Sequence, residues 1–333
     1  MDDPANVENR NAGNGGDLVK HTVYLAVLRF LLAQEPWRSK LTVRECHAGR
    51  GAYRIPDRDP RRKLLSCLYA SGAGSSPVPL HDAQRSILDR LGCWPPSVEG
   101  AGWYVGSAPI NAYALAQGPG DSHELELYEL LPETRRILRS VLAQAQPEAH
   151  QFWSVLPKEE QGKEFDGEAH IAREIKDWGK QNLVLLDPFA MWRQPSDQAK
   201  RDLYGAIIDG LVSRRPDAAS LILFWTWGRA FPVAHADLHG TARPVRNGYA
   251  ELRAKLHEGG FDFVLIKWLW GLQFAMWVVV PAGHLTALRD AIDCHCRLLS
   301  DHLIQHGCGR SLRHPQVAVT IDCPCRPKPS GAP

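Results

Sequence analysis

The sequence predicts an α/β fold in which helices cover a doubly wound, mostly parallel sheet. Three short runs read as buried strands, at residues 41–46, 124–129 and 182–187. Each run ends in a glycine-rich turn or a carboxylate. Stretches with the apolar spacing of helices separate them. Because parallel strands present their carboxyl ends at one edge of a sheet, these polar groups predict a single ligand site there.

The N-terminal part contains a predicted helix and the first strand. Residues Thr22–Gln34 are apolar at helical spacing, and we expect this helix to pack on the sheet. The strand Leu41–Cys46 follows and leads into Gly49 and Gly51. Glycine at such a turn lets the backbone approach a nucleotide-like ligand closely.

A helical insertion is predicted after Tyr53. It comprises residues 64–91, is interrupted by a Gly- and Ser-rich loop at 71–77, and closes at Trp94–Ser97. In this fold class such an insertion commonly covers part of the ligand site, and we expect it to do so here. Residues 38–63 hold nine Lys or Arg and three acids, which predicts either a phosphate-binding patch or a solvated basic surface.

Acidic residues follow the next predicted strands and one predicted turn. Glu124–Glu129 alternates as a strand does and ends in a carboxylate suited to ribose hydroxyls. Phe165–Gly167 places an acid on a turn. Asn182–Asp187 is an apolar run that opens into a loop at Pro188. The order of these features favours a ligand site over three unrelated turns.

The C-terminal half is expected to complete the sheet. Leu221–Trp227 is the predicted fifth core strand. Phe261–Pro281 is apolar enough to raise the question of a membrane span, but polar residues and a glycine interrupt it. Two buried strands joined near Gly271 fit better. The acidic, polar N-terminus shows no targeting signal, so a cytoplasmic location and no membrane partner are expected.

The ordered motifs resemble one family of enzymes. They are the segment A-G-N-x-x-D-x-x-K-H-T at 12–22, His47-Ala-Gly-x-Gly, Gly106-Ser107-Ala-Pro109, Glu129-Leu-Leu-Pro132, Asp166-Gly167 and Asp187-Pro188. They resemble the RlmJ type of S-adenosylmethionine-dependent methyltransferases, which modify adenine N6 in 23S ribosomal RNA. The resemblance covers most of residues 11 to about 290. It implies a class I, Rossmann-like fold with a seven-stranded, mostly parallel sheet and a helical insertion subdomain.

The resemblance also implies a pocket for the methyl donor, S-adenosyl-L-methionine. In it Glu129 accepts hydrogen bonds from the ribose hydroxyls and Asp166 accepts from the adenine amine. The positions that match the donor pocket are Lys20, His21, His47, Gly49, Gly51, Ser107, Glu129, Asp166, Gly167 and Asp187.

Asp187 is the predicted catalytic residue, together with Pro188. In amine methyltransferases of this kind, the aspartate and the proline carbonyl hold the target amine, and positioning supplies much of the rate. This chain has Phe189 and Ala190 where the family motif has a second proline and an aromatic residue. The variant is similar to that of the three-Cys-motif partner proteins (TcmP). The candidate substrate-binding residues are Asn11, Phe189, Trp192 and Trp225.

The chain of 333 residues is long enough for one large core. We divide it into an N-terminal arm with the first helix, strand and loop (1–55), the helical insertion (56–102), the remaining methyltransferase core (103–290) and a C-terminal helix with a Cys- and Pro-rich tail (291–333). Five of the eight cysteines lie in that last part. Their C-x-C spacing does not fit a zinc knuckle, so no metal is expected.

The predicted function is N-methylation by direct transfer, most simply of adenine N6 in RNA. Two alternatives remain open. In the first, the methyl acceptor is an amine of a nucleoside, a small metabolite or a peptide. This would fit the altered motif after Pro188 and the changed N-terminal arm. Alternatively, the chain is a methyltransferase-like binding protein without catalysis, since a fold does not determine a function.

Overall fold

The computed structural model describes residues 13–70, 78–93, 102–120, 122–146, 152–157, 165–178, 181–186, 198–213, 220–227, 248–270, 272–279, 282–308 and 316–323. Five predicted site residues lie outside these ranges: Asn11, Asp187, Pro188, Phe189 and Trp192. The backbone of Trp225 is described, but its side chain is not.

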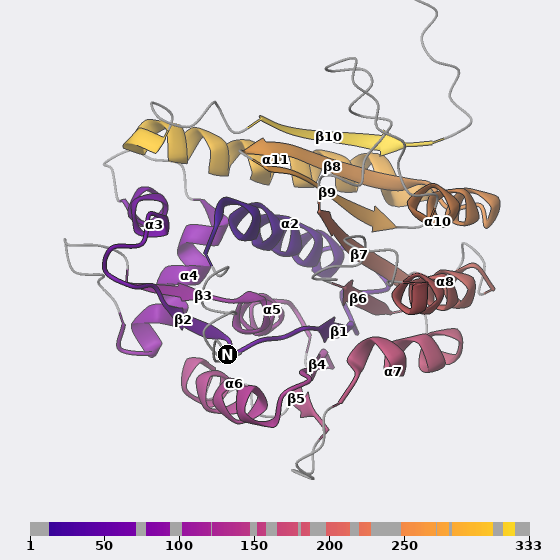
Figure 1. The fold of residues 1–333 in the computed structure, drawn as a ribbon, viewed down its shortest axis with the longest axis horizontal. Coiled ribbons are helices and arrows are strands. Elements are labelled where there is room, and N and C mark those ends of the chain that lie inside the picture. The colour runs from indigo at the N-terminus through magenta and orange to yellow at the C-terminus, as the bar shows by residue number, and fades with distance from the viewer. Residues whose placement is uncertain are drawn as a thin grey trace, which may run out of the picture.

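An eight-stranded sheet runs through the described part of the chain (Figure 1). Its order is β10-β8-β9-β7-β6-β1-β4-β5. The strands are β1 (Thr42–Cys46), β4 (Glu124–Tyr128), β5 (Trp153–Leu156), β6 (Asn182–Leu186), β7 (Ser220–Trp227), β8 (Phe263–Trp270), β9 (Leu272–Val279) and β10 (Gln316–Asp322). From β7 to β5 all neighbours are parallel, whereas β9 is antiparallel to both β7 and β8. A separate antiparallel pair joins β2 (Ala52–Arg54) and β3 (Trp103–Val105).

Helices cover both faces of the sheet (Figure 1). One face carries α2 (Gly15–Leu32), α5 (Ser107–Ala116), α6 (Pro132–Ala145) and α11 (Leu285–Leu303). The other carries α7 (Gly167–Glu174), α8 (Gln198–Ser213) and α10 (Gly248–Glu258). The other described helices are α3 (Arg61–Tyr69) and α4 (Pro79–Arg90), the short 3-10 helices η2 (Ile175–Asp177) and η5 (Ala282–His284), and the π-helix η6 (Ile304–Cys308).

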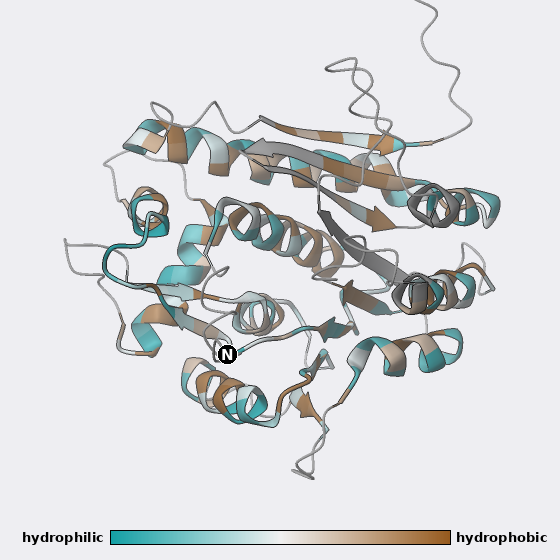
Figure 2. Ribbon diagram, in the orientation of Figure 1, coloured by the Kyte–Doolittle hydropathy of each residue, from teal (hydrophilic) through white to brown (hydrophobic). Residues whose placement is uncertain are grey.

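Strand β6 shows why the sheet is covered on both faces. All five of its residues are buried. Leu183 and Leu185 pack in the core with α2 and α5, whereas Val184 and Leu186 pack in the core with α8 and α10. This alternation follows from the two-residue period of a strand. Figure 2 shows hydrophobic residues gathered on the described central strands and hydrophilic ones on the outer turns of α3, α4 and α6.

The predicted α/β fold with a parallel sheet is confirmed, and the expected strand count of seven is wrong. Gln316–Asp322 adds β10, which pairs antiparallel with β8 along the whole strand. From Val317 to Thr320 partly exposed and exposed residues alternate, which is typical of an edge strand. The prediction had assigned this segment to a tail. The predicted strand pair around Gly271 is observed as β8 and β9.

Helix α2 begins seven residues before the predicted start at Thr22. The Asn14 side chain caps it by accepting a hydrogen bond from the Asp17 amide at 3.0 Å. Asp17 also lies in the first turn, where a carboxylate favours the positive end of the helix dipole. Periodicity alone missed this start because Gly15 and Gly16 carry no apolar side chain.

The predicted insertion contains helices α3 and α4. Their apolar residues belong to the same core as α2 and α5, so this segment is packed against the rest of the protein. The division into four parts stays a prediction. Among the described helices, none has both the length and the hydropathy needed to cross a bilayer.

The central sheet should tolerate little loss of side-chain volume. Leu185 on β6 is fully buried, and Leu185→Ala should lower the free energy of unfolding by about 2–5 kcal/mol. Leu130 is 44% exposed, and Leu130→Ala should change the free energy of unfolding by less than about 0.5 kcal/mol. Chemical denaturation measures both, and equal effects would contradict the assignment of β6 to the core.

Candidate functional site

The turn after β1 is fastened to the end of β4. His47, Gly49 and Gly51 have positive φ values of 63°, 64° and 81°. This backbone conformation is common only for glycine, so His47 is held by its surroundings. The Ala48 amide donates to the Tyr128 carbonyl at 3.2 Å, and the Gly49 amide donates to Glu129 Oε2 at 2.9 Å. The predicted glycine turn and the predicted carboxylate are therefore in direct contact.

Glu129 is buried, with 5% of its surface exposed. Its second oxygen, Oε1, accepts from the Leu131 amide at 3.1 Å. Arg135 holds the same turn by donating to the backbone carbonyls of Glu129 and Leu130, both at 2.8 Å. A carboxylate has about four acceptor positions, so two neutral amides leave capacity for further donors.

Helix α7 begins beside these two strands. Asp166 caps it, since its Oδ1 accepts from the Ala169 amide at 3.0 Å. The Phe165 amide donates to the Leu130 carbonyl at 3.3 Å, which ties the segment to the end of β4. A Cβ atom on Gly167 would lie 2.4 Å from Tyr128 Cβ. Only glycine at this position allows α7 to approach so closely.

His47 contacts an acid that sequence reasoning missed. Its Nε2 lies 3.3 Å from Glu168 Oε1, and Glu168 is 2% exposed. The same oxygen accepts from the Tyr204 hydroxyl on α8 at 2.6 Å. Glu168 directly follows the predicted Gly167, and its place one residue into a helix is the signal that could have pointed to it.

Ser107 contacts a second acid that was missed. Its hydroxyl donates to Glu45 Oε1, and the Asn111 amide donates to Glu45 Oε2 at 2.8 Å. Glu45 and Asn111 are both buried. Glu45 is the only acid within the first strand, and that unusual position in an apolar run was its sequence signal.

Lys20 and His21 lie on α2, where both are buried. Lys20 Nζ is 3.1 Å from Asp17 Oδ1. The His21 ring stacks on Tyr104 at 5.5 Å between centroids, and its Nδ1 lies 2.6 Å from the Tyr104 hydroxyl. Burial, and then the charge of Lys20, hold the pKa of His21 well below its usual range.

The structure brings the described site residues into two neighbouring groups. The first contains His47, Gly49, Glu129, Asp166 and Gly167, at the carboxyl ends of β1 and β4. The second contains Lys20, His21, Gly51 and Ser107, around β2 and β3.

Tyr53 connects the two groups. Its hydroxyl lies 2.1 Å from where a Cβ of Gly49 would be, and its ring lies 3.1 Å from the Cβ position of Gly106. Gly106 in turn donates to the Gly51 carbonyl at 2.8 Å. Tyr53 was not predicted as a site residue.

Two of the late cysteines, Cys294 and Cys296, do not share a face of their helix. On α11, Cys294 is exposed and Cys296 is buried. No three His, Cys, Asp or Glu side chains among the described residues gather in a way that would hold a metal ion.

No protein-family model matches the sequence, and no curated protein matches it. The fold is similar to the crystal structure of protein LPL1258 from Legionella pneumophila str. Philadelphia 1, assigned to family model DUF519. The TM-score is 0.57 at 16% identity, with 94% of this chain and 98% of that one covered. At this identity the similarity shows a shared fold.

Two further structures are more distant. The METTL16 MTase domain has a TM-score of 0.36 at 8% identity, over 77% of this chain and 66% of that one. TrmN from Thermus thermophilus has 0.32 at 11% identity, over 77% and 48%. Both TM-scores are too low to establish a common fold.

The close packing of α7 gives one prediction. Gly167→Ala should lower the free energy of unfolding by about 1–3 kcal/mol, because its methyl group would overlap Tyr128. Gly283→Ala is the matched control, since a Cβ there meets no atom within 4 Å. Thermal and chemical denaturation of both variants test this. A Gly167→Ala protein as stable as the control would contradict the packing.

The buried His21 gives a second prediction. Its pKa is lower in the folded protein than in the unfolded chain, where it is about 6.5. The unfolded state therefore binds a proton first as the pH falls below about 6.5, and stability drops from there toward the folded pKa. His21→Phe should reduce the slope of stability against pH in this window. Urea unfolding between pH 7 and pH 5 measures it, and an unchanged slope would show that His21 does not contribute.

Proposed function

We propose that this protein is an S-adenosyl-L-methionine-dependent N-methyltransferase, most simply of adenine N6 in RNA. The observation that carries the proposal is the bond between Glu129 Oε2 and the Gly49 amide. It sets a buried carboxylate at the end of one parallel strand directly against a glycine turn at the end of its neighbour. This is the edge at which doubly wound folds bind nucleosides.

The residues at this edge fit the donor. Glu129 has acceptor capacity left for ribose hydroxyls, as counted above. Asp166 is exposed and uses Oδ1 for its helix cap, so Oδ2 can accept from an adenine amine. Glycine at positions 49 and 51 lets Tyr53 and Leu138 pack directly against the turn, which fixes its shape beside Glu129.

The sheet order supports the same class of enzyme. The resemblance implied a mostly parallel sheet, and in the described sheet five neighbouring strands are parallel while β9 lies antiparallel between β7 and β8. This arrangement puts the carboxyl ends of β6, β1 and β4 next to one another.

Asp187 and Pro188 are the proposed catalytic residues. They directly follow β6, the strand beside β1. In this role the Asp187 carboxylate and the Pro188 carbonyl accept hydrogen bonds from the target amine and orient its lone pair. The carboxylate can also take the proton that the amine loses. When bound, S-adenosyl-L-methionine supplies an electrophilic methyl group.

Covalent catalysis by cysteine is not part of the proposal. Cys46 at the end of β1 is buried and belongs to the core that contains Tyr128 and Val184. A thiol packed in this way is a structural group, and direct transfer to nitrogen needs no enzyme nucleophile.

An RNA acceptor is supported by exposed cations next to the glycine turn. Some of the basic residues between 38 and 63 are engaged: Arg61 pairs with Asp59, and Arg62 pairs with Asp57. Arg54 and Arg58 are exposed and available for phosphates. The altered motif after Pro188 favours the second candidate, an amine of a nucleoside, metabolite or peptide.

A transfer assay tests the proposal. The purified protein is incubated with methyl-labelled donor and, in parallel, with total RNA, a small-molecule extract and a peptide mixture. Label in N6-methyladenosine from RNA supports the main proposal, and label only in another fraction supports the second candidate. No transfer to any fraction would contradict methyltransferase activity.

Asp187→Ala should lower the transfer rate at least about a hundredfold, because the target amine loses its main acceptor. Donor affinity should stay within about twofold of the wild type. Asp301→Ala, at an exposed position on α11, is the matched control and should keep full activity. Transfer by Asp187→Ala at the control's rate would exclude the proposed role.

A further inference from the structure

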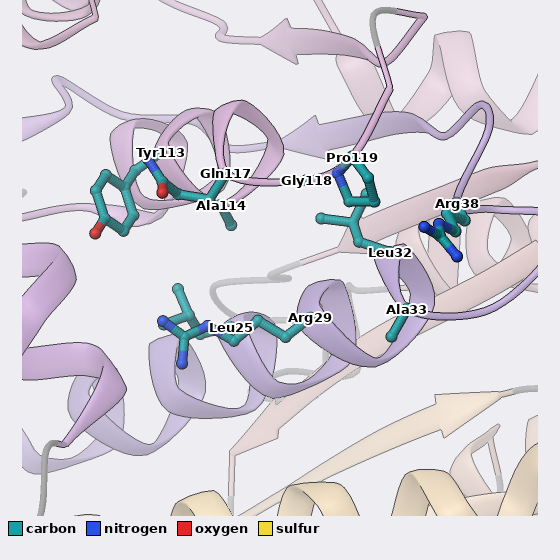
Figure 3. A pocket seen from close by; sticks show the side chains of 10 residues that line it. All are labelled: Leu25, Arg29, Leu32, Ala33, Arg38, Tyr113, Ala114, Gln117, Gly118 and Pro119. Atoms are coloured by element: carbon teal, nitrogen blue, oxygen red, sulfur yellow. The ribbon is translucent and has the colours of Figure 1, made fainter.

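A cavity of about 420 Å³ lies away from the donor site, between the last turns of α2 and α5 (Figure 3). Residues from α2, from α5 and from the segments that follow them line it. Arg29 lies eight residues beyond His21 on α2, which is about 12 Å along the helix. Gln117 lies ten residues beyond Ser107, about 15 Å along α5. The cavity is therefore separate from His21 and Ser107, and its lining contains no residue of the Glu129 edge.

Its charged lining is entirely positive. Arg29 and Arg38 are both exposed, and no acid lines the cavity among the described residues. Within that part of the chain, neither guanidinium makes a hydrogen bond or an ion pair. By contrast, Arg61, Arg62, Arg136 and Arg253 all pair with carboxylates.

Helix capping does not account for these arginines. At the end of α2, the amides of Ala33 and Gln34 donate to the carbonyls of Phe30 and Leu31. At the end of α5, the amides of Gln117 and Gly118 satisfy the last carbonyls in the same way. Each helix end contributes about −0.5 charge, so two arginines leave about one net positive charge.

The rest of the lining is suited to an organic group. Leu25 and Leu32 from α2 and Ala114 from α5 are apolar, and Tyr113 and Gln117 add an aromatic ring and an amide. Figure 3 shows Arg29 and Tyr113 toward one end of the cavity and Arg38 beside Pro119 toward the other. A volume of this size is within the range of small-molecule sites.

We propose that this cavity binds a nucleotide, with Arg38 at one end holding its phosphate and with Arg29, Tyr113 and the apolar residues contacting its base and sugar. Arginine is suited to phosphate because its planar donors form paired hydrogen bonds with the oxygens. The nucleotide is either free or part of an RNA strand. The site does not depend on the proposed methyl transfer.

Binding measurements on the full chain test this. The probes are adenosine 5′-monophosphate, followed by calorimetry, and a fluorescein-labelled single-stranded RNA hexamer, followed by anisotropy. Arg29→Gln and Arg38→Gln should each weaken binding about tenfold or more, since Arg38→Gln removes the charged phosphate contact and Arg29→Gln removes the guanidinium that contacts the base. For RNA, Arg38→Gln should also lower the salt slope by about 0.7. Arg297→Gln on α11, with a side chain that is 74% exposed, is the control and should bind normally.

The outcomes separate the sources of the phosphate and can overturn the proposal. Binding of the monophosphate through these arginines identifies a free nucleotide. Binding of the RNA but not of the monophosphate, weakened by the same two substitutions, identifies an RNA strand as the ligand. Either result supports the site. Displacement of the monophosphate by S-adenosylhomocysteine would place it at the Glu129 edge and overturn the proposal. So would absence of binding by both probes, or equal binding by both Gln variants and the wild type.

Discussion

The site depends on the Glu129 carboxylate, which accepts the amides of Gly49 and Leu131. These bonds hold the turn after β1 against the end of β4. The turn contains three residues with positive φ, a backbone shape that costs free energy for His47 and needs outside support. Removal of the carboxylate would release the turn and leave buried amides without partners, at about 1–3 kcal/mol each. The Glu129 side chain therefore holds the turn in place and also belongs to the proposed ligand site.

Buried acids are concentrated at this edge of the sheet. Glu45, Glu129 and Glu168 are each 5% exposed or less. Burial of a carboxylate is costly unless hydrogen bonds compensate it, and here amides, hydroxyls and a histidine do so. The acids at this edge are therefore held in place by specific hydrogen bonds. The second cavity differs in charge, because its charged lining residues in the described part of the chain are Arg29 and Arg38.

Much of the architecture could be predicted because strand signals are local. The run Asn182–Leu186 is apolar at every position, and its burial on both faces follows directly. Strand β10 could not be predicted in this way, since an edge strand needs no apolar run and its pairing with β8 is set by the tertiary fold. The start of α2 depended on the Asn14 cap, which periodicity does not record.

The site was predictable only in outline. A strand end followed by an acid suggested that Glu129 would lie near the Gly49 turn, and the two are hydrogen-bonded. The partners of Ser107 and His47 were missed, since Glu45 and Glu168 come from other elements and only packing brings them close. Positions of the described residues are established, while their roles toward the donor remain proposals.

Calorimetry with S-adenosylhomocysteine tests the central claim most directly. The wild-type protein should bind one equivalent. Glu129→Gln should weaken that binding about tenfold or more, because the ribose hydroxyls lose a charged acceptor. Glu133→Gln, an exposed acid four residues away on α6, should bind as the wild type does. No binding to the wild type, or equal binding by both variants, would contradict the account.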